Sequence, residues 1–168
     1  MSTTLLQQIG NTVAAEFSDL PDVEQATRVL LRLLLAALLG GLLGTEREAR
    51  GKAAGVRTHM LVAMGAALFV LVSQQSGMHE ADMSRVVQGV IAGVGFLGAG
   101  AILKLDDEEK VKGLTTAAGI WLTAAIGVAA GMGREATAVL SALLALVIFA
   151  VVPSLERVVD RWSRRKKD

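Results

Sequence analysis

Long apolar runs separated by short polar segments dominate the pattern of this chain. The runs lack the apolar–polar alternation of β-barrel strands, and each is somewhat shorter than the ~20 residues that usually cross a bilayer. Only helices and closed barrels satisfy their backbone hydrogen bonds in lipid, so the pattern predicts an all-α polytopic membrane protein with five transmembrane helices. The expected spans are residues 26–44, 58–73, 86–103, 114–130 and 136–152.

The segment before the first span, residues 1–25, follows a different pattern. Leu5, Ile9, Val13 and Phe17 recur every four residues, with polar side chains elsewhere around the helix. This spacing predicts an amphipathic helix lying on the outer membrane interface. Two roles are open for it, a solubilising lead-in or a surface for a partner. The segment has no basic residue, unlike the start of a secretory signal.

The third and fourth spans are rich in small residues. A glycine in a soluble helix costs about 1 kcal/mol relative to alanine, but in lipid small residues let helices approach closely. We expect helix packing here, and a homodimer, because five helices cannot bury all of this small surface internally. Thr115 and Thr116 could cap the fourth helix or hydrogen-bond to the third. The expected packing residues are Gly89, Gly93, Gly95, Gly98, Gly100, Gly113, Thr115 and Thr116.

Basic residues gather on one side of the expected membrane. They are concentrated between the first two spans, between the third and fourth, and after the fifth. The positive-inside rule therefore places the N-terminus outside and the C-terminus in the cytoplasm, as an odd number of spans requires. The chain then divides into an amphipathic segment (1–25), a five-helix transmembrane domain (26–153) and a basic cytoplasmic tail (154–168). Pro153 is expected to end or kink the last span.

Composition supports a membrane protein and excludes several other classes. The 168 residues are 52% hydrophobic and 20% charged, and the charges are confined to a few interruptions. There is no cysteine, which excludes disulfides, thiol catalysis and cysteine–metal sites. No nucleophile–base set or HExxH pattern occurs, so we expect no enzyme and no cofactor. A net charge of +1 gives no reason to expect a nucleic-acid partner.

The connection after the first span concentrates acidic and basic residues. Glu46 and Arg50 can pair at i, i+4, and Thr45 with Glu48 has the spacing of a capping box. Either the basic residues only fix topology, or the motif forms a cytoplasmic docking or anion-binding surface, with Arg47, Arg50, Lys52 and Arg57 as working residues and Glu46 and Glu48 orienting them. The candidate motif comprises Glu46, Arg47, Glu48, Arg50, Gly51, Lys52, Gly55, Arg57, Thr58 and His59.

Arg32 lies inside the first expected span, where a charge is costly unless it snorkels or pairs. Its side chain is expected either to reach the outer headgroups or to form a buried pair with Asp82 or Glu135, at the outer ends of neighbouring helices. No confident metal site is visible. An acidic run in the third connection is a candidate for loose Mg²⁺ contact, although such runs usually form solvated loops. The run comprises Asp106, Asp107, Glu108 and Glu109.

Two segments resemble the signatures of a known family. The run LGTEREARGKAAGVRTHMLVAMGAALFVLVS is similar to the first signature of the MgtC/SapB family of bacterial inner-membrane proteins. The runs SRVVQGVIAGVGFLGAGAIL and VKGLTTAAGIWLTAAIGVAAG are similar to the second. Together they cover residues 43–131, in the family's order and spacing. Several members add a cytoplasmic C-terminal domain, whereas only a short basic tail follows the last span here, so functions of that domain do not carry over.

The resemblance implies a multi-pass, non-enzymatic protein of the bacterial inner membrane. It implies roles in growth under magnesium limitation and in stress or survival inside host cells, with modulation of the proton-translocating ATP synthase rather than Mg²⁺ transport. From the residues, three classes stay open: a regulator that binds a second integral membrane protein, a transporter or channel for Mg²⁺ or another small ion, and an enzyme. The expected spans contain no Asp, Glu or Lys, which favours the regulator.

Overall fold

The computed structural model describes residues 4–20, 22–102 and 113–164, and every regular element in them is an α-helix. Five of these helices are long and apolar enough to cross a membrane, which confirms the expected all-α fold with five spans. The orientation of the termini stays a prediction. The helices are α1 (Leu5–Glu16), α2 (Val23–Ala49), α3 (Val56–Gln75), α4 (Glu80–Ile102), α5 (Leu114–Gly131) and α6 (Glu135–Arg164).

The chain forms two compact units, Met1–Leu31 and Arg32–Asp168. The first contains α1, which forms where the four-residue apolar spacing places it. At its start the Gln7 Oε1 atom accepts a hydrogen bond from the Thr4 backbone N–H at 3.3 Å. The apolar side chains of Leu5, Ile9 and Val13 in α1, and of Phe17 directly after it, are exposed within this unit, and the interfacial position of the helix stays a prediction.

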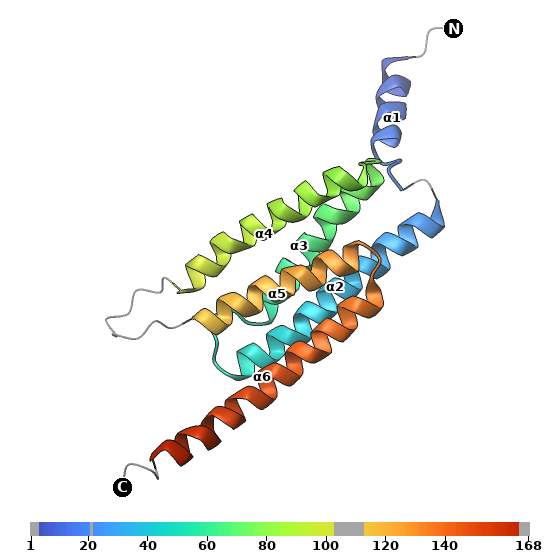
Figure 1. The fold of residues 1–168 in the computed structure, drawn as a ribbon. Coiled ribbons are helices and arrows are strands. Elements are labelled where there is room, and N and C mark those ends of the chain that lie inside the picture. Colours follow the sequence, from blue (N-terminus) through green and yellow to red (C-terminus); the bar gives the residue numbers. More distant parts are fainter. Residues whose placement is uncertain (1–3, 21, 103–112, 165–168) are drawn as a thin grey trace. The chain divides into compact units, whose positions relative to one another are not determined.

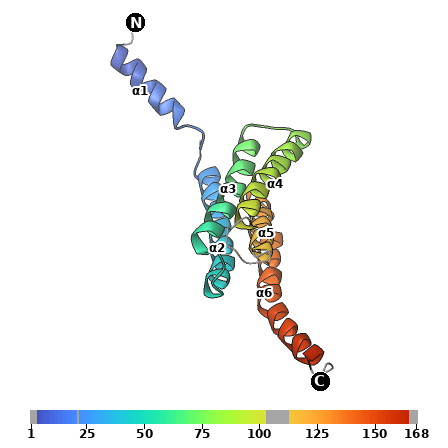
Figure 2. The same ribbon diagram turned by 90° about the vertical axis from the view of Figure 1, so that its left-hand side faces the viewer.

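In the second unit α5 is the central helix, in contact with α3, α4 and α6, while α4 also touches α3 (Figure 1). The 90° view shows α4 again at the edge of this group (Figure 2). Only 11% of the α4 span is buried, the smallest share among the five. An open apolar groove of about 590 Å³ runs between α3 and α4, lined in part by Gly65, Gly89 and Gly93.

Close helix packing depends on glycines other than those expected. A Cβ at Gly127 would collide with the backbone oxygen of Ala63, and a Cβ at Gly131 would lie 2.6 Å from the Ala67 oxygen, so α5 packs directly on the α3 backbone. On α2, a Cβ at Gly40 would lie 2.5 Å from the His59 oxygen, and one at Gly44 would lie 2.5 Å from Val56 Cα. These pairs, each four residues apart, form the tight contacts.

The expected packing role within the chain is therefore wrong for four residues of α4. Nothing lies within 4 Å of a Cβ built at Gly89, Gly93, Gly95 or Gly100. Gly98 differs, because its Cβ position is 3.6 Å from Ala117 Cβ on α5. The physical reason is the rotation of the helix: α4 turns Val90 and Val94 into the contact with α5, while Gly89 and Gly93 line the open groove between α3 and α4.

Two helix boundaries differ from expectation. Helix α2 continues to Ala49, so Thr45 does not begin a helix; its hydroxyl instead donates to the Leu42 backbone oxygen at 2.8 Å, and the expected capping box is wrong. Helix α6 continues through Pro153 to Arg164. Proline removes one N–H donor without breaking this helix, so the last span and the tail share one continuous element.

Candidate functional site

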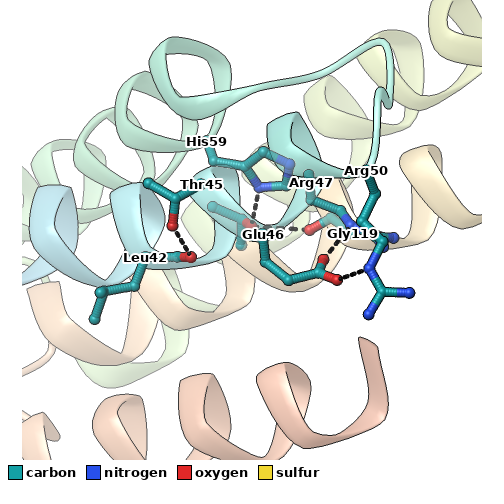
Figure 3. Close-up of polar contacts among 8 residues, drawn as sticks. Leu42, Thr45, Glu46, Arg47, Arg50, His59 and Gly119 are labelled. Carbon is teal, nitrogen blue, oxygen red and sulfur yellow. Dashed lines mark hydrogen bonds and ion pairs between the residues drawn. The ribbon is translucent and has the colours of Figure 1, made fainter. Parts of the chain in front are cut away.

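Four helices meet around one arginine near the end of α2. The missing side chain of Gly44 lets this part of α2 touch the start of α3, and the continued helix then directs Arg47 inward rather than into a loop. Arg47 is only 2% exposed. Figure 3 shows it beside Glu46, His59 and Gly119, from α2, α3 and α5.

Arg47 is held by a carboxylate and by an aromatic ring. Its Nε atom lies 2.8 Å from Glu46 Oε2, and its guanidinium carbon lies 3.9 Å from the centroid of the Phe149 ring on α6. Glu46 is shared, because its Oε1 atom lies 2.8 Å from Arg50 Nε one turn later. A buried cation needs such partners, since the cost of removing it from water is several kcal/mol.

His59 is fully buried and hydrogen-bonded across to α5. Its Nδ1 atom lies 2.7 Å from Thr123 Oγ1, and the Thr123 hydroxyl donates to the Gly119 backbone oxygen at 2.9 Å. Because that hydroxyl has a single proton, we assign the imidazole Nδ1–H as the donor to Thr123. Among the residues that the structure describes, the buried His59 Nε2 and Arg47 Nη1 atoms have no hydrogen-bond partner.

Gly119 makes room for this arrangement. A Cβ at Gly119 would lie 3.5 Å from Phe149 Cζ, 3.6 Å from His59 Cε1 and 3.9 Å from Arg47 Cδ. These are ordinary van der Waals distances, so alanine fits at this position, and only a side chain larger than alanine would push these three groups apart. The cluster offers one free donor and one free acceptor beside a fixed positive charge. Such a set suits a neutral polar ligand or water far better than a metal cation.

The connection between α2 and α3 is short and carries the remaining residues of the motif. Gly51 turns the chain at φ 65°, and Glu48 Oε2 accepts a hydrogen bond from the Val56 backbone N–H at 2.9 Å, which satisfies a free donor at the start of α3. A Cβ at Gly55 would collide with that carboxylate. Thr58 is half-buried, whereas Arg50, Lys52 and Arg57 are exposed.

Only part of the expected working surface is exposed. Arg50, Lys52 and Arg57 face outward, but Arg47 is buried, and the expectation that it belongs to the exposed set is wrong. The positive-inside rule assumes that every basic residue of a loop is solvated. Arg47 is not, because α2 extends to Ala49 and buries it. Glu46 orients Arg47 and Arg50, and Glu48 orients the backbone of α3 instead.

A second arginine cluster lies in the N-terminal half of α2, around Arg32. Arg32 Nη1 donates to the Gly131 backbone oxygen at 3.0 Å and to Gln74 Oε1 at 3.1 Å, while its Nε lies 3.6 Å from Glu135 Oε1. The side chain thereby joins α2 to the ends of α3, α5 and α6. Asp82, the other expected partner, forms no ion pair among the described residues.

The remaining expected residues have separate positions. Gly113 caps α5 at φ 97°, and a Cβ there would collide with the Ala101 backbone oxygen. Thr116 is buried and Thr115 is exposed. Within the residues described, no group of three or more His, Cys, Asp or Glu side chains could hold a metal ion. The acidic run at residues 106–109 lies outside the described residues.

Sequence patterns missed three members of the cluster around Arg47: Gly119, Thr123 and Phe149. Gly119 and Thr123 are four apart on α5, which places a small and a polar residue on one helix face and could have indicated a buried hydrogen bond. Phe149 had no such signal, because an aromatic residue in an apolar span is ordinary. The paired glycines Gly127 and Gly131 had the same four-residue spacing as the glycines on α4.

Known proteins resemble this chain over most of its length. It is 44% identical to Protein SrpB of Synechococcus elongatus over 148 residues, which cover 80% of this chain and 79% of that protein. It is 42% identical to the Putative magnesium transporter YhiD of Escherichia coli over 134 residues, covering 75% of this chain and 61% of that protein. It is 41% identical to Protein MgtC of Brucella abortus over 132 residues, covering 78% and 54%.

The chain therefore spans only about half to three fifths of YhiD and of the Brucella protein. No solved structure matches it. Residues 33–158 match the sequence profile of the MgtC family, a range that begins directly after Arg32 and includes Arg47 and all five apolar spans except the start of the first. On this match and on the identities above, the chain is a multi-pass membrane protein that belongs to the MgtC family.

Proposed function

We propose that this chain is a non-enzymatic regulatory protein of the bacterial inner membrane that acts by binding a second integral membrane protein during adaptation to magnesium limitation and stress. The proposal rests on one observation, that the buried interior around α2 is apolar. Between Arg32 and Arg47 the buried residues of α2 are Ala36, Leu39, Gly40, Leu43 and Gly44.

The interior supports a regulator better than a cation transporter. Mg²⁺ sheds its water reluctantly and needs oxygen ligands or a wet pore. In the described residues the core around α2 is apolar, and a buried or half-buried arginine lies at each end of it. A cation entering along α2 from either side would meet a fixed positive charge.

The exposed basic residues beside the Arg47 cluster are the proposed docking surface. Arg50 and Lys52 lie in the α2–α3 connection, and Arg57 lies at the start of α3. Glu46 holds Arg50 through an ion pair, and Glu48 accepts a hydrogen bond from the Val56 backbone N–H. In this proposal Arg47 and His59 position that connection rather than touching the partner. The family resemblance makes the proton-translocating ATP synthase the first partner to examine.

A transporter is the second candidate, favoured by one observation: a 42% identical relative is named Putative magnesium transporter YhiD. A measurement of Mg²⁺ flux distinguishes the regulator from the transporter. Purified protein in liposomes should pass no Mg²⁺ under an imposed gradient and potential, because no cluster of acidic and histidine side chains that could replace the ion's water occurs among the described residues. Saturable Mg²⁺ flux that disappears in a destabilised Arg47 variant would establish the transporter instead.

The regulator is tested by affinity purification from membranes after crosslinking, with antibodies against ATP synthase subunits as the first probe. Arg57→Gln should lose the partner and fail to support growth in low Mg²⁺, while its amount in the membrane stays normal. The matched control is Arg85→Gln, which removes an exposed charge on α4. Equal recovery of partner with both variants, together with normal growth, would contradict the docking surface.

A further inference from the structure

The groove between α3 and α4 is apolar along its whole lining. Its walls include the large side chains of Leu61 and Phe69 on α3 and of Leu97 on α4, all of which are exposed within the chain. Figure 2 shows the two helices side by side, joined at one end by the α3–α4 turn. The volume of about 590 Å³ is in the range of pockets that hold small organic molecules. An apolar groove within a membrane span takes up hydrocarbon rather than water.

The length of the groove matches one leaflet of a membrane. On α4 the lining extends from Val86 to Leu97, eleven residues apart, which corresponds to roughly 16 Å along a helix. The hydrocarbon layer of a typical bilayer is about 30 Å thick, so one leaflet contributes about 15 Å. The groove therefore has the length and the volume for one extended acyl chain that lies along the two helices.

Two charged side chains of α4 lie just beyond the end of the groove that is nearest the α3–α4 turn. Arg85 is one helical turn before Gly89, and Asp82 is one turn before Val86, so both continue the side of α4 that lines the groove. Both lie within the apolar span of α4, where a charge is costly without a partner. Among the described residues neither forms an ion pair, so a bound molecule can supply the counter-ions.

The order of these features along α4 matches the order of groups in a phospholipid that has an amine headgroup. From the middle of the membrane outward come the groove, the cation of Arg85 and the anion of Asp82, which is about 4.5 Å further along the helix. Phosphatidylethanolamine presents an acyl chain, a phosphate and an ammonium group in the same direction. A guanidinium donates paired hydrogen bonds to phosphate oxygens, and a carboxylate accepts from an ammonium group.

We propose that the groove between α3 and α4 binds phosphatidylethanolamine, with one acyl chain between the helices, the phosphate on Arg85 and the ammonium group on Asp82. One molecule then satisfies all three features, while its second acyl chain stays in the surrounding bilayer. The positive-inside rule places this end of α4 outside, so the lipid comes from the outer leaflet. Phosphatidylglycerol offers a phosphate but no cation for Asp82, which makes the choice of headgroup the test of the site.

This inference does not rest on the proposed function, because a regulator and a transporter could each hold a lipid in this groove. Arg85→Gln should lose the lipid and keep the protein partner, whereas Arg57→Gln should keep the lipid and lose the partner. Lipid binding is measured on the purified chain alone, and the function is measured by Mg²⁺ flux and by recovery of a different protein. Failure of either measurement therefore leaves the other interpretable.

The first experiment measures lipid binding to the purified, delipidated chain in detergent by native mass spectrometry. Phosphatidylethanolamine and phosphatidylglycerol with the same oleoyl chains are titrated separately, and the ethanolamine lipid should bind about fivefold more tightly. Arg85→Gln should weaken its binding about fivefold, while Arg134→Gln, which removes an exposed arginine from the α5–α6 connection, should not. Equal affinities for the two lipids, or an unaffected Arg85→Gln protein, would overturn the proposal.

The second experiment separates the headgroup contact from the groove. Asp82→Asn should make the two affinities equal, because it removes the partner of the ammonium group and leaves the phosphate contact. Gly93→Leu should weaken binding of both lipids about fivefold, because nothing in the chain lies within 4 Å of its Cβ position and the new side chain enters the groove. Gly95→Leu, the same change at an exposed position outside the groove, should weaken neither. A preserved preference in Asp82→Asn would refute the headgroup contact, and unaffected binding in Gly93→Leu would refute the groove.

The third experiment identifies the occupant in a bilayer. A photo-crosslinking amino acid replaces Phe69 on the groove wall or, as a control, Leu144 on the exposed side of α6. The full chain is irradiated in native membranes and in vesicles that contain equal amounts of phosphatidylethanolamine and phosphatidylglycerol. In the vesicles, adducts at Phe69 should contain about threefold more of the ethanolamine lipid, and adducts at Leu144 should contain both lipids equally. Equal lipid adducts at Phe69, or adducts there mainly to a second copy or to another membrane protein, would overturn the proposal.

Discussion

Arg47 shows how a single residue can be both buried and charged beside a membrane. Its charge is balanced by Glu46, its flat face lies on Phe149, and Gly119 leaves room for both. Water cannot replace any of these partners, because Arg47 is almost fully buried. The energy of the pair is therefore realised only when four helices are in place, which links this side chain to the whole bundle.

Replacing Arg47 by Met is expected to destabilise the protein by about 3 kcal/mol, because the change keeps the apolar stem but removes the charge from a buried pair. The measurement is thermal unfolding in detergent. Arg57→Met is the control, since Arg57 is exposed, and its unfolding temperature should stay at the wild-type value. Similar temperatures for both variants would show that burial of Arg47 contributes nothing to stability.

Thr123 offers a second test at this scale. Valine has nearly the same shape, but Thr123→Val leaves the buried Nδ1–H of His59 without an acceptor. We expect a loss of about 1–3 kcal/mol in unfolding free energy. Thr115→Val on the exposed side of the same helix should cost almost nothing. If the two valine variants have the same unfolding free energy, the His59–Thr123 hydrogen bond contributes nothing to stability.

At the scale of helices, backbone contact between α3 and α5 is the tightest feature of the bundle. Gly127 and Gly131 lie on the carbonyl oxygens of Ala63 and Ala67. No rotamer change can relieve a clash with a backbone atom, so any added side chain there forces the two helices apart. The helices gain dispersion contacts over this short distance that a longer one would forfeit.

Gly127→Ala should therefore destabilise the protein even though alanine favours helix formation. Gly95→Ala, with open space around its Cβ position, should be neutral or stabilising by up to about 1 kcal/mol. The two substitutions are chemically identical, so opposite signs of their effects on the unfolding free energy isolate the contribution of helix packing. Thermal unfolding in one detergent measures both, and a gain of stability in Gly127→Ala would contradict the contact.

The glycines also show why the sequence predicts helices better than it predicts their contacts. Apolar length identified all five spans, because lipid leaves a helix few alternatives. Four-residue glycine spacing occurs on both α4 and α5, however, and only the rotation of each helix in the bundle decides which pair is buried. The burial of Arg47 was unpredictable for the same reason: it depends on where α2 stops and which neighbours surround its end.

For the whole molecule, topology is the expectation with the most direct test. The positive-inside rule places the α2–α3 connection in the cytoplasm and the α3–α4 turn outside. Single cysteines at Ala53 and Ser76, both exposed, should then react with an impermeant maleimide from opposite sides of the membrane. Ser76 should be labelled in intact cells and Ala53 only after lysis. The reverse pattern would invert the orientation and move the proposed docking surface outside.

The positions of the two arginines on α2 set a thickness for the membrane around the protein. Fifteen residues separate Arg32 from Arg47, which corresponds to roughly 22 Å along a helix. A typical hydrocarbon layer measures about 30 Å, so both arginines lie near water only where the surrounding lipid is thinner. We therefore expect the bundle to unfold at a higher temperature in short-chain than in long-chain lipid bilayers, which makes bilayer thickness a variable that this protein senses.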